Sequence, residues 1–323
     1  MSVLVYTENW DGKFKKLSFE LVSYASKVAE MLGASTTVLS LGEVEQSELE
    51  NLGNYGADKI INGTNNALGV FDSQAYTNAI ASVVDKEGSS VIILSNNNAG
   101  KAIAPRLSVK FKAGIGSGIS KLPVSTDPFV VYKRAFSGNA YSNLQINSEK
   151  KILTLAQNSF DIVENNKGAA IENMGIEIDD SVIKTEVMDI QKQTGKLLLN
   201  DADIVVSGGR GMKSPDNWGP LTELADLLEA ATACSRPVSD EGWRPHEEHT
   251  GQTGKIIGPN LYFAIGISGA TQHLAGVSSS KYIVAINTDK DAPIFEAAQY
   301  GIVGDAQKVL PALVEAVKES KLK

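Results

Sequence analysis

The sequence predicts an α/β protein built from two doubly wound domains. In both halves of the chain, short apolar segments suited to buried strands alternate with segments of helical periodicity. A polar stretch with little periodicity separates the halves, and 323 residues are enough for two domains with separate cores. We therefore expect a first domain over residues 1–190 and a second over residues 191–323.

The N-terminal half begins with an alternation of strands and helices. Val3–Tyr6 is a short apolar strand, and apolar residues then recur at helical spacing from Leu17 to Leu32, where Gly33 ends the helix. The predicted strands that follow are Thr36–Leu41, Lys59–Ile61 and Val91–Leu94. The last run is apolar throughout, which is typical of a parallel strand covered on both faces.

From about Gly114 the pattern changes to strands joined by short turns. The predicted strands are Phe129–Ala135, Tyr141–Ile146 and Ile152–Leu155, with turns at Ser137–Asn139 and Asn147–Glu149. This spacing predicts an antiparallel extension of the first domain. Residues 164–200 are mostly polar, with periodicity only around Ile176–Val187, so the domain boundary is placed near residue 190.

The C-terminal half returns to the alternating pattern. The predicted elements are a strand at Ile204–Val206, a helix marked by apolar residues from Leu221 to Ala231, strands at Leu261–Ile265 and Tyr282–Ile286, and a last helix that starts at Pro311.

Composition restricts the class of protein. A net charge of −8 argues against a nucleic-acid-binding protein. No apolar run reaches the roughly 20 residues needed to cross a bilayer, so we expect a chain that is not inserted in a membrane. With no signal or transit pattern at Met1 and a single Cys234, the expected location is a reducing, cytoplasmic compartment.

Four polar motifs in the second half carry the functional signal. They are Ser207–Gly211, Ser235–Pro237, Gly251–Lys255 and Ser268–His273. Glycine turns alternate there with hydroxyls, amides, one His and one Arg expected to be buried. Such groups suit an anionic, hydrogen-bond-rich cofactor better than a hydrolytic triad or a metal, so neither a catalytic nor a metal-binding residue is expected.

Each motif also has a purely structural interpretation. The first motif is compatible with an ordinary tight turn, the third with a hairpin turn, and Arg236 with a cation that stabilises a helix dipole. His273 alone is compatible with a structural histidine, and Asn287 with a turn. The third motif is not a phosphate-binding Walker A loop, because no Ser or Thr follows Lys255. His246 and His249 are assigned to a solvated acidic loop.

In their order and spacing, the four motifs resemble the alpha subunit of electron transfer flavoprotein. The resemblance covers nearly the whole chain and is densest from Ile204 to Gly304. It implies an N-terminal domain similar to adenine nucleotide hydrolases, without a bound nucleotide, and a flavodoxin-like or Rossmann-like C-terminal domain that binds FAD. It also implies a heterodimer in which the N-terminal domain contacts a beta subunit that holds AMP.

The resemblance implies the following FAD-binding residues: Arg210, Ser235, Arg236, Thr250, Gly251, Gln252, Thr253, Ser268, Gly269, Ala270, Thr271, Gln272, His273, Asn287, Gln299 and Tyr300. Ser235 would bind the diphosphate, and Arg236 would lie against the isoalloxazine ring. Gln252 would lie along the ring, Thr253 would face N5, and His273 would face the C2 carbonyl.

The chain departs from the family pattern at two of these positions. Thr250 stands where relatives often carry Val, so its contribution would come from the backbone. Gln299 stands where the family usually carries Asp, which removes a charge and keeps an acceptor at the adenine end, near Asn287. Arg134, Gly138 and Asn139 resemble a further family pattern in the first domain, with no role beyond holding a turn.

The function implied by the resemblance is that of an electron carrier rather than a substrate-converting enzyme. Such a subunit shuttles electrons from flavin dehydrogenases, such as the acyl-CoA dehydrogenases of fatty acid β-oxidation, to a membrane quinone oxidoreductase through a stabilised flavin semiquinone. The alternatives are a relative specialised for nitrogen fixation or flavin-based electron bifurcation, a flavin or NAD oxidoreductase, and a non-redox nucleotide-binding module. The missing dinucleotide fingerprint counts against an NAD enzyme.

Overall fold

The computed structural model describes residues 2–136, 140–183, 185–190 and 197–321. The chain divides into two compact units, Met1–Gln191 and Lys192–Lys323. Each unit is built on a large, mainly parallel sheet with helices on both faces, which confirms the predicted α/β fold class.

The sheet of the first unit has the strand order β10-β9-β7-β11-β6-β1-β4-β5-β12. These strands are β1 (Ser2–Thr7), β4 (Ser35–Leu41), β5 (Lys59–Thr64), β6 (Ser89–Ser95), β7 (Gly114–Ile119), β9 (Phe129–Ala135), β10 (Ala140–Gln145), β11 (Lys151–Leu155) and β12 (Ala170–Gly175). Along this spatial order, every neighbouring pair from β7 through β11, β6, β1, β4 and β5 to β12 is parallel. At the other end, β9 and β10 form an antiparallel edge. The short β8 (Ser125–Thr126) pairs with β9, and β2 (Asn9–Trp10) pairs with β3 (Lys13–Phe14).

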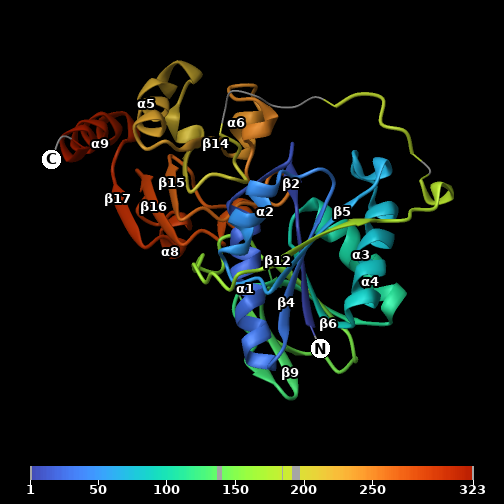
Figure 1. The fold of residues 1–323 in the computed structure, drawn as a ribbon. Coiled ribbons are helices and arrows are strands. Elements are labelled where there is room, and N and C mark those ends of the chain that lie inside the picture. Colours follow the sequence, from blue (N-terminus) through green and yellow to red (C-terminus); the bar gives the residue numbers. More distant parts are fainter. Residues whose placement is uncertain (1, 137–139, 184, 191–196, 322–323) are drawn as a thin grey trace. The chain divides into compact units, whose positions relative to one another are not determined.

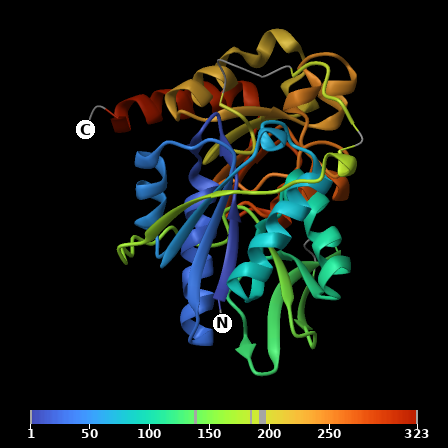
Figure 2. The same cartoon turned by 45° about the vertical axis from the view of Figure 1, so that its right-hand side comes forward.

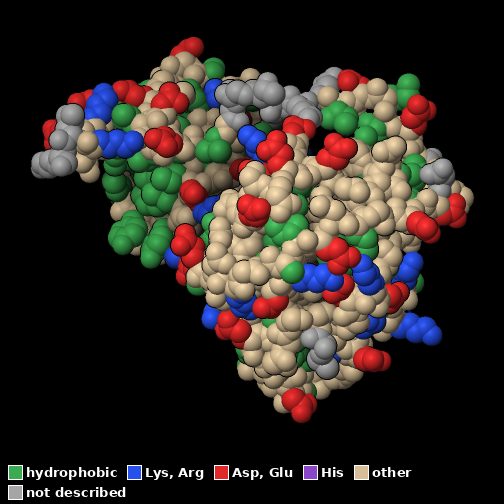
Figure 3. All heavy atoms as spheres, in the orientation of Figure 1, with side chains coloured by type: hydrophobic (Ala, Val, Ile, Leu, Met, Phe, Trp, Pro, Cys, Tyr) green, Lys and Arg blue, Asp and Glu red, His purple; other side chains and the backbone are tan. Residues whose placement is uncertain are grey.

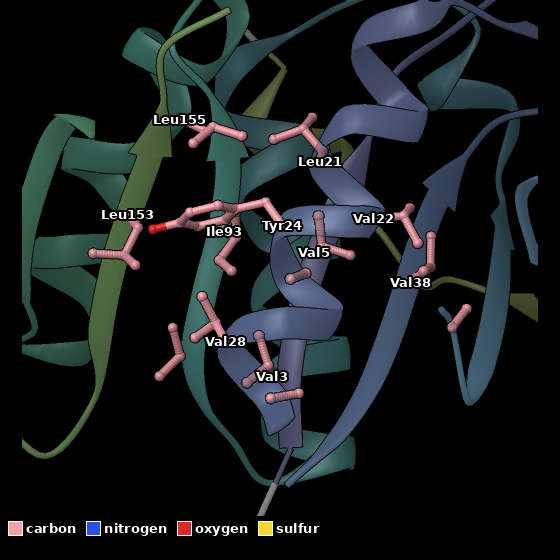
Figure 4. Close-up of a cluster of buried hydrophobic side chains, with 14 of the residues drawn as sticks. Val3, Val5, Leu21, Val22, Tyr24, Val28, Val38, Ile93, Leu153 and Leu155 are labelled. Carbon is pink, nitrogen blue, oxygen red and sulfur yellow. The ribbon is translucent and has the colours of Figure 1, made fainter. Parts of the chain in front are cut away.

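Two helices cover each face of this sheet (Figures 1 and 2). One face packs against α1 (Lys16–Leu32) and α2 (Gln46–Gly53), and the other against α3 (Ser73–Glu87) and α4 (Asn98–Phe111). Alternate residues of the central strand enter the two cores. Val5 meets Tyr24 of α1, as Figure 4 shows, whereas Leu4 lies in the core with Ile80 of α3.

Local sequence signals account for most of these elements. The helix that ends at Gly33 is confirmed, since Gly33 adopts a left-handed conformation (φ 62°) and its N–H bonds the carbonyls of the last turn. The strand Phe129–Ala135 is confirmed to the residue, and its pairing with β10 confirms part of the antiparallel extension. The predicted turn Ser137–Asn139, with Gly138, lies outside the described residues.

One strand was assigned to the wrong part of the sheet. Ile152–Leu155 belongs to β11, which runs parallel to β6 and β7 and lies between them. Its residues from Ile152 onward are fully buried, as expected for an interior strand rather than an extension. The prediction also missed β12 at the opposite edge, because an exposed edge strand such as Ala170–Gly175 needs no apolar run.

The second unit has the strand order β14-β13-β15-β16-β17, and every pair is parallel. The strands are β13 (Ile204–Gly208), β14 (Ala231–Cys234), β15 (Leu261–Ile265), β16 (Tyr282–Asn287) and β17 (Tyr300–Val303). Counted along the chain, the order is 2-1-3-4-5, which is the flavodoxin-like arrangement. Helices α5 (Gly219–Leu227) and α9 (Ala306–Lys321) pack on one face, and α7 (Thr271–Val277) and α8 (Ile294–Ala297) on the other.

Two helix boundaries in this unit differ from the prediction. The helix that includes Leu221 ends at Leu227, and Ala231 instead begins β14. Helix α9 begins at Ala306, so Pro311 lies inside the helix rather than at its start. The helix can begin earlier because Asp305 accepts the backbone N–H of Gln307 through its side chain, at 3.0 Å.

The outer strand of the second sheet carries exposed apolar side chains. Tyr300 is 64% exposed and Val303 is 61% exposed. Figure 3 shows hydrophobic side chains gathered over this strand, β17. Within the described ranges, no helix is both long enough and apolar enough to span a bilayer.

Candidate functional site

The predicted polar motifs lie at the carboxyl edge of the second sheet. The first follows β13, the second β14 and the fourth β15, and Asn287 ends β16. Because all these strands are parallel, their carboxyl ends meet at one edge. The connections from β13 and β15 lead to opposite sides of the sheet, so this edge contains the switch point at which doubly wound folds bind ligands.

The glycines of the first motif form a close crossing of two loops. The N–H of Gly209 donates to Ile265 O at 2.8 Å, and that of Gly211 donates to Gly266 O at 3.0 Å. A Cβ on Gly209 would lie 2.2 Å from Gly266 O. The loops after β13 and β15 therefore touch through their backbones, and side chains cannot fit between them. Arg210 lies exposed at this crossing.

A hydrogen bond joins the second and third motifs. Arg236 donates from Nη1 to Thr253 Oγ1 at 3.2 Å and from Nε to Asp240 Oδ2 at 3.3 Å. Arg236 is the first residue of α6 (Arg236–Asp240), where a helix dipole disfavours a cation, so the dipole does not account for it. Ser235, which precedes α6, is buried.

The expectation of a buried Arg is wrong. The side chain of Arg236 is 61% exposed. It stands at the rim of the sheet, where Thr253 and Asp240 hold its guanidinium group.

The third motif is anchored on both sides. Its start is fixed to β14, since the N–H of Thr250 donates to Cys234 O at 3.0 Å. Its tip is fixed to the fourth motif, since the N–H of Gln252 donates to Gln272 O at 2.7 Å. Gly251 has φ 147°, a conformation that favours glycine. The second, third and fourth motifs therefore form one connected surface, and Gln252 and Thr253 are exposed on it.

His249 does not lie in a solvated loop. Its side chain is 3% exposed and packs beneath the third motif, where a Cβ on Gly254 would lie 2.7 Å from its Nδ1. Burial lowers the pKa of His249, and His246 and Arg236 lower it further. The expectation failed because the residue forms a bridge with Cys234 and so extends the sheet, a long-range pairing that the polar local sequence does not reveal. His246 is exposed, as expected.

His273 is also buried, with 7% exposure, on the first turn of α7. Its Nε2 lies 2.9 Å from the hydroxyl of Tyr262, a buried residue of β15 that the sequence marked only as part of an apolar strand. Burial lowers the pKa of His273 to about 4, with the Thr250 backbone acting in the opposite direction. The imidazole is therefore neutral at pH 7.

Several polar groups at this edge are buried or constrained without partners. Among the described residues, Ser207 Oγ and His273 Nδ1 form no hydrogen bond. The backbone N–H groups of Gly269 and Ala270 likewise have no acceptor in the described part of the chain. Unpaired donors of this kind fit a ligand rich in acceptors, such as the diphosphate and ring carbonyls of FAD. Ser268, Thr271 and Gln272 are exposed beside them.

The side chain of Asn287 is used within the loop structure. It donates to Ile267 O at 2.8 Å and accepts the N–H of Asp289 at 3.0 Å, so it holds the turn between β15 and α7.

The structure does not bring Gln299 and Tyr300 to this edge. They lie at the amino end of β17, where Gln299 Oε1 accepts the N–H of Ile283 at 2.7 Å. The carboxyl end of the same strand leads instead to Asp305. Asp305 forms an ion pair with Lys213 at 2.8 Å and so connects the loops after β13 and β17.

Within the described part of the chain, no group of three or more His, Cys, Asp or Glu side chains is placed to hold a metal ion. The donors at this edge are hydroxyl, amide, guanidinium and imidazole groups.

Comparison with known proteins identifies the family. The model described as "Electron transfer flavoprotein domain" matches residues 3–179, and that described as "Electron transfer flavoprotein FAD-binding domain" matches residues 198–278. The electron transfer flavoprotein subunit alpha of Syntrophomonas wolfei is 34% identical over 316 residues, which is 98% of each chain. That of Bacillus subtilis is 33% identical over 323 residues, which is 98% of this chain and 97% of the relative.

A relative with a different printed name is similar over the same extent. Subunit LctC of the lactate dehydrogenase (NAD(+),ferredoxin) of Acetobacterium woodii is 31% identical over 98% of this chain and 77% of its own length. These matches confirm the resemblance seen in the four motifs. The chain therefore belongs to the electron transfer flavoprotein alpha subunit family, and its second unit is an FAD-binding domain of that family.

Proposed function

We propose that this chain pairs with a beta subunit, holds FAD at the carboxyl edge of β13–β17, and carries electrons between redox partners. The observation that supports this most strongly is the meeting of four separate motifs at the switch point of a flavodoxin-like sheet, beside buried donors that lack partners. FAD supplies the one-electron and two-electron redox chemistry, which protein side chains alone do not provide.

The protein groups divide by the part of the cofactor that they would hold. The N–H groups of Gly269 and Ala270 and the buried Ser235 suit the diphosphate, because they follow parallel strands at one edge. His273 supplies a neutral donor to a ring carbonyl. Such contacts position the cofactor and need no acid–base pair on this chain.

Arg236 and Thr253 suit the isoalloxazine ring. Thr253 holds the guanidinium through its hydroxyl, so the cation has a defined position at the rim. A unit positive charge about 4 Å from a developing negative charge contributes roughly 1 kcal/mol in water and more as solvent is excluded. Arg236 therefore favours electron addition, and its effect grows when the bound cofactor covers it.

The partners follow from the family. Alpha subunits of this family pair with a beta subunit, and we assign the first unit, Met1–Gln191, to that contact, with AMP in the beta subunit. We propose flavin dehydrogenases such as acyl-CoA dehydrogenases as donors and a membrane quinone oxidoreductase as acceptor. The names of relatives also include an acryloyl-CoA reductase electron transfer subunit and Protein FixB, so the donor is the point that experiment must decide.

Co-purification with the beta subunit tests the proposal. The complex should be yellow, release FAD and AMP on denaturation, and accept electrons from an acyl-CoA dehydrogenase supplied with its acyl-CoA. NADH in place of the dehydrogenase should give no reduction, whereas rapid reduction by NADH would favour a bifurcating relative. A colourless preparation, even after addition of FAD to the complex, would refute the proposal. The isolated chain should also lose FAD faster than the complex does.

A further inference from the structure

A buried tyrosine lies directly behind His273. Tyr262 is fully buried on β15, its hydroxyl oxygen lies 2.9 Å from His273 Nε2, and the two rings are 6.1 Å apart. The sequence pattern and the family match assign this tyrosine no role beyond that of a residue in an apolar strand. Its hydroxyl nevertheless lies within hydrogen-bonding distance of an imidazole of the proposed FAD site, with the Ser207 and Thr250 side chains also beside it.

We propose that Tyr262 is a positioning residue that fixes the tautomer of His273, so that Nε2 accepts a hydrogen bond and Nδ1 carries the proton offered to the cofactor. The inference deepens the proposed function, on which its last step rests. It assigns the choice of donor nitrogen to a residue that does not itself reach the ligand.

The protonation states leave one consistent arrangement. Burial raises the pKa of Tyr262, so its phenol is protonated and has one hydrogen to donate. His273 is neutral at pH 7, because burial lowers its pKa to about 4. A neutral imidazole has one donor nitrogen and one acceptor nitrogen. One of the two rings must therefore donate to the other, and only one hydrogen can lie between Tyr262 and Nε2.

The surroundings favour the tyrosine as the donor. The Ser207 and Thr250 side chains also lie within hydrogen-bonding reach of the Tyr262 hydroxyl, so satisfying that hydrogen does not by itself choose the tautomer. The backbone of Thr250 does choose it, because it raises the pKa of His273 as a hydrogen-bond partner of the ring. This is the effect of a carbonyl that accepts a ring N–H, and Nε2 already faces Tyr262, so the N–H is on Nδ1.

The other ring nitrogen then becomes the functional donor. His273 Nδ1 is buried and makes no hydrogen bond of normal geometry among the described residues, although the Thr250 backbone acts on the ring as a hydrogen-bond partner and raises its pKa. A protonated Nδ1 at the switch-point edge is a directed donor for an acceptor on the bound cofactor. Tyr262 holds that proton in place by occupying Nε2, as partners of histidine do in other sites.

The tautomer can be read directly by nuclear magnetic resonance. The chain has three histidines, so the full chain in complex with its beta subunit, labelled with nitrogen-15 histidine, gives a spectrum that can be assigned. We expect Nδ1 of His273 to be protonated and Nε2 to be unprotonated, with or without FAD. A wild-type spectrum with the proton on Nε2 would overturn the inference, whether or not any variant folds.

Two variants complete the test. Tyr262→Phe should abolish the tautomer preference and weaken FAD binding about tenfold, which is the loss of one hydrogen bond to the cofactor. Tyr282→Phe is the control, because Tyr282 lies on the adjacent strand β16 and is 46% exposed. An unchanged tautomer and FAD affinity in Tyr262→Phe would also overturn the inference. If the chain binds no FAD but His273 keeps its Nδ1 proton, the proposed function fails and the pairing with Tyr262 stands.

Discussion

Replacement of Gly276 by alanine should displace the loop that carries Gln252 and Thr253. Gly276 lies on α7, and a Cβ there would lie 2.4 Å from Gly251 Cα, 2.5 Å from its N and 2.8 Å from its carbonyl carbon. These are backbone atoms, which cannot rotate away as a side chain can. Since ordinary contacts begin near 3.4 Å, the loop or the helix must move by about 1 Å.

The size of the effect follows from two opposing terms. Overpacking of this kind costs about 1–3 kcal/mol, and alanine in a helix recovers about 1 kcal/mol relative to glycine. We therefore expect the free energy of unfolding to fall by about 0–2 kcal/mol. FAD affinity should fall by about tenfold or more, because the displaced loop carries the bond from Gln252 N–H to Gln272 O and the exposed Thr253.

Flavin fluorescence titration and thermal unfolding of the complex measure both quantities. Gly219→Ala is the matched control, because Gly219 begins α5 and a Cβ there meets no atom within 4 Å. The control should bind FAD normally and be as stable as the wild type or slightly more stable. Equal FAD affinity and equal unfolding midpoints for the two variants would show that the contact between Gly276 and Gly251 does not shape the site.

Three further predictions concern the same unit. Arg236→Ala should make the one-electron reduction potentials of bound FAD more negative, because it removes the cation held by Thr253, and it should leave the far-ultraviolet circular dichroism unchanged. Arg236→Lys keeps the charge and should retain most of the wild-type potential. Identical potentials for Arg236→Ala and the wild type in a spectroelectrochemical titration would contradict this role. The free energy of unfolding should fall by about 3 kcal/mol through His273 as the pH decreases from about 6.5 towards 4, because His273 takes up a proton in the unfolded chain but stays neutral in the folded one. Urea unfolding at several pH values should show a weaker dependence of this free energy on pH for His273→Gln than for the wild type. An equal dependence on pH in both proteins would exclude His273 as the source. Pro311→Ala should stabilise the unit by about 1–3 kcal/mol, since it restores an N–H that can bond the Gln307 carbonyl in α9, and an unchanged unfolding midpoint would contradict it.

The sequence was most informative where burial is continuous along the chain. The limits of β15 agree with its apolar run to the residue, because strands buried in a sheet need uninterrupted apolar side chains. The limits of β9 agree as well, although its burial is only partial and the strand includes Lys133 and Arg134. The strands that were missed lack this signal. Ala170–Gly175 is a partly exposed edge, and Ala231–Cys234 is a short strand of small residues that follows a helix closely.

The candidate site was predicted less evenly, because its geometry depends on contacts between distant segments. The motifs after β13, β14 and β15 were found, since glycine, hydroxyl and amide residues after a strand have a known use. The burial of His249 under Gly254 and the pairing of Tyr262 with His273 join segments that no local pattern connects. Gln299 and Tyr300 were assigned by resemblance alone, and they lie at the amino end of β17.

The glycine crossing at the switch point has a consequence for how this half of the protein can change. Gly209 donates to the last residue of β15 and Gly211 to the residue after it, so the loops after β13 and β15 form one connected unit rather than two independent loops. These loops lose their conformational entropy when the chain folds, so a ligand that binds there does not have to order them. For the same reason a side chain added at Gly209, Gly211 or Gly266 would force the opposite loop to retreat, so the two loops can only be altered together.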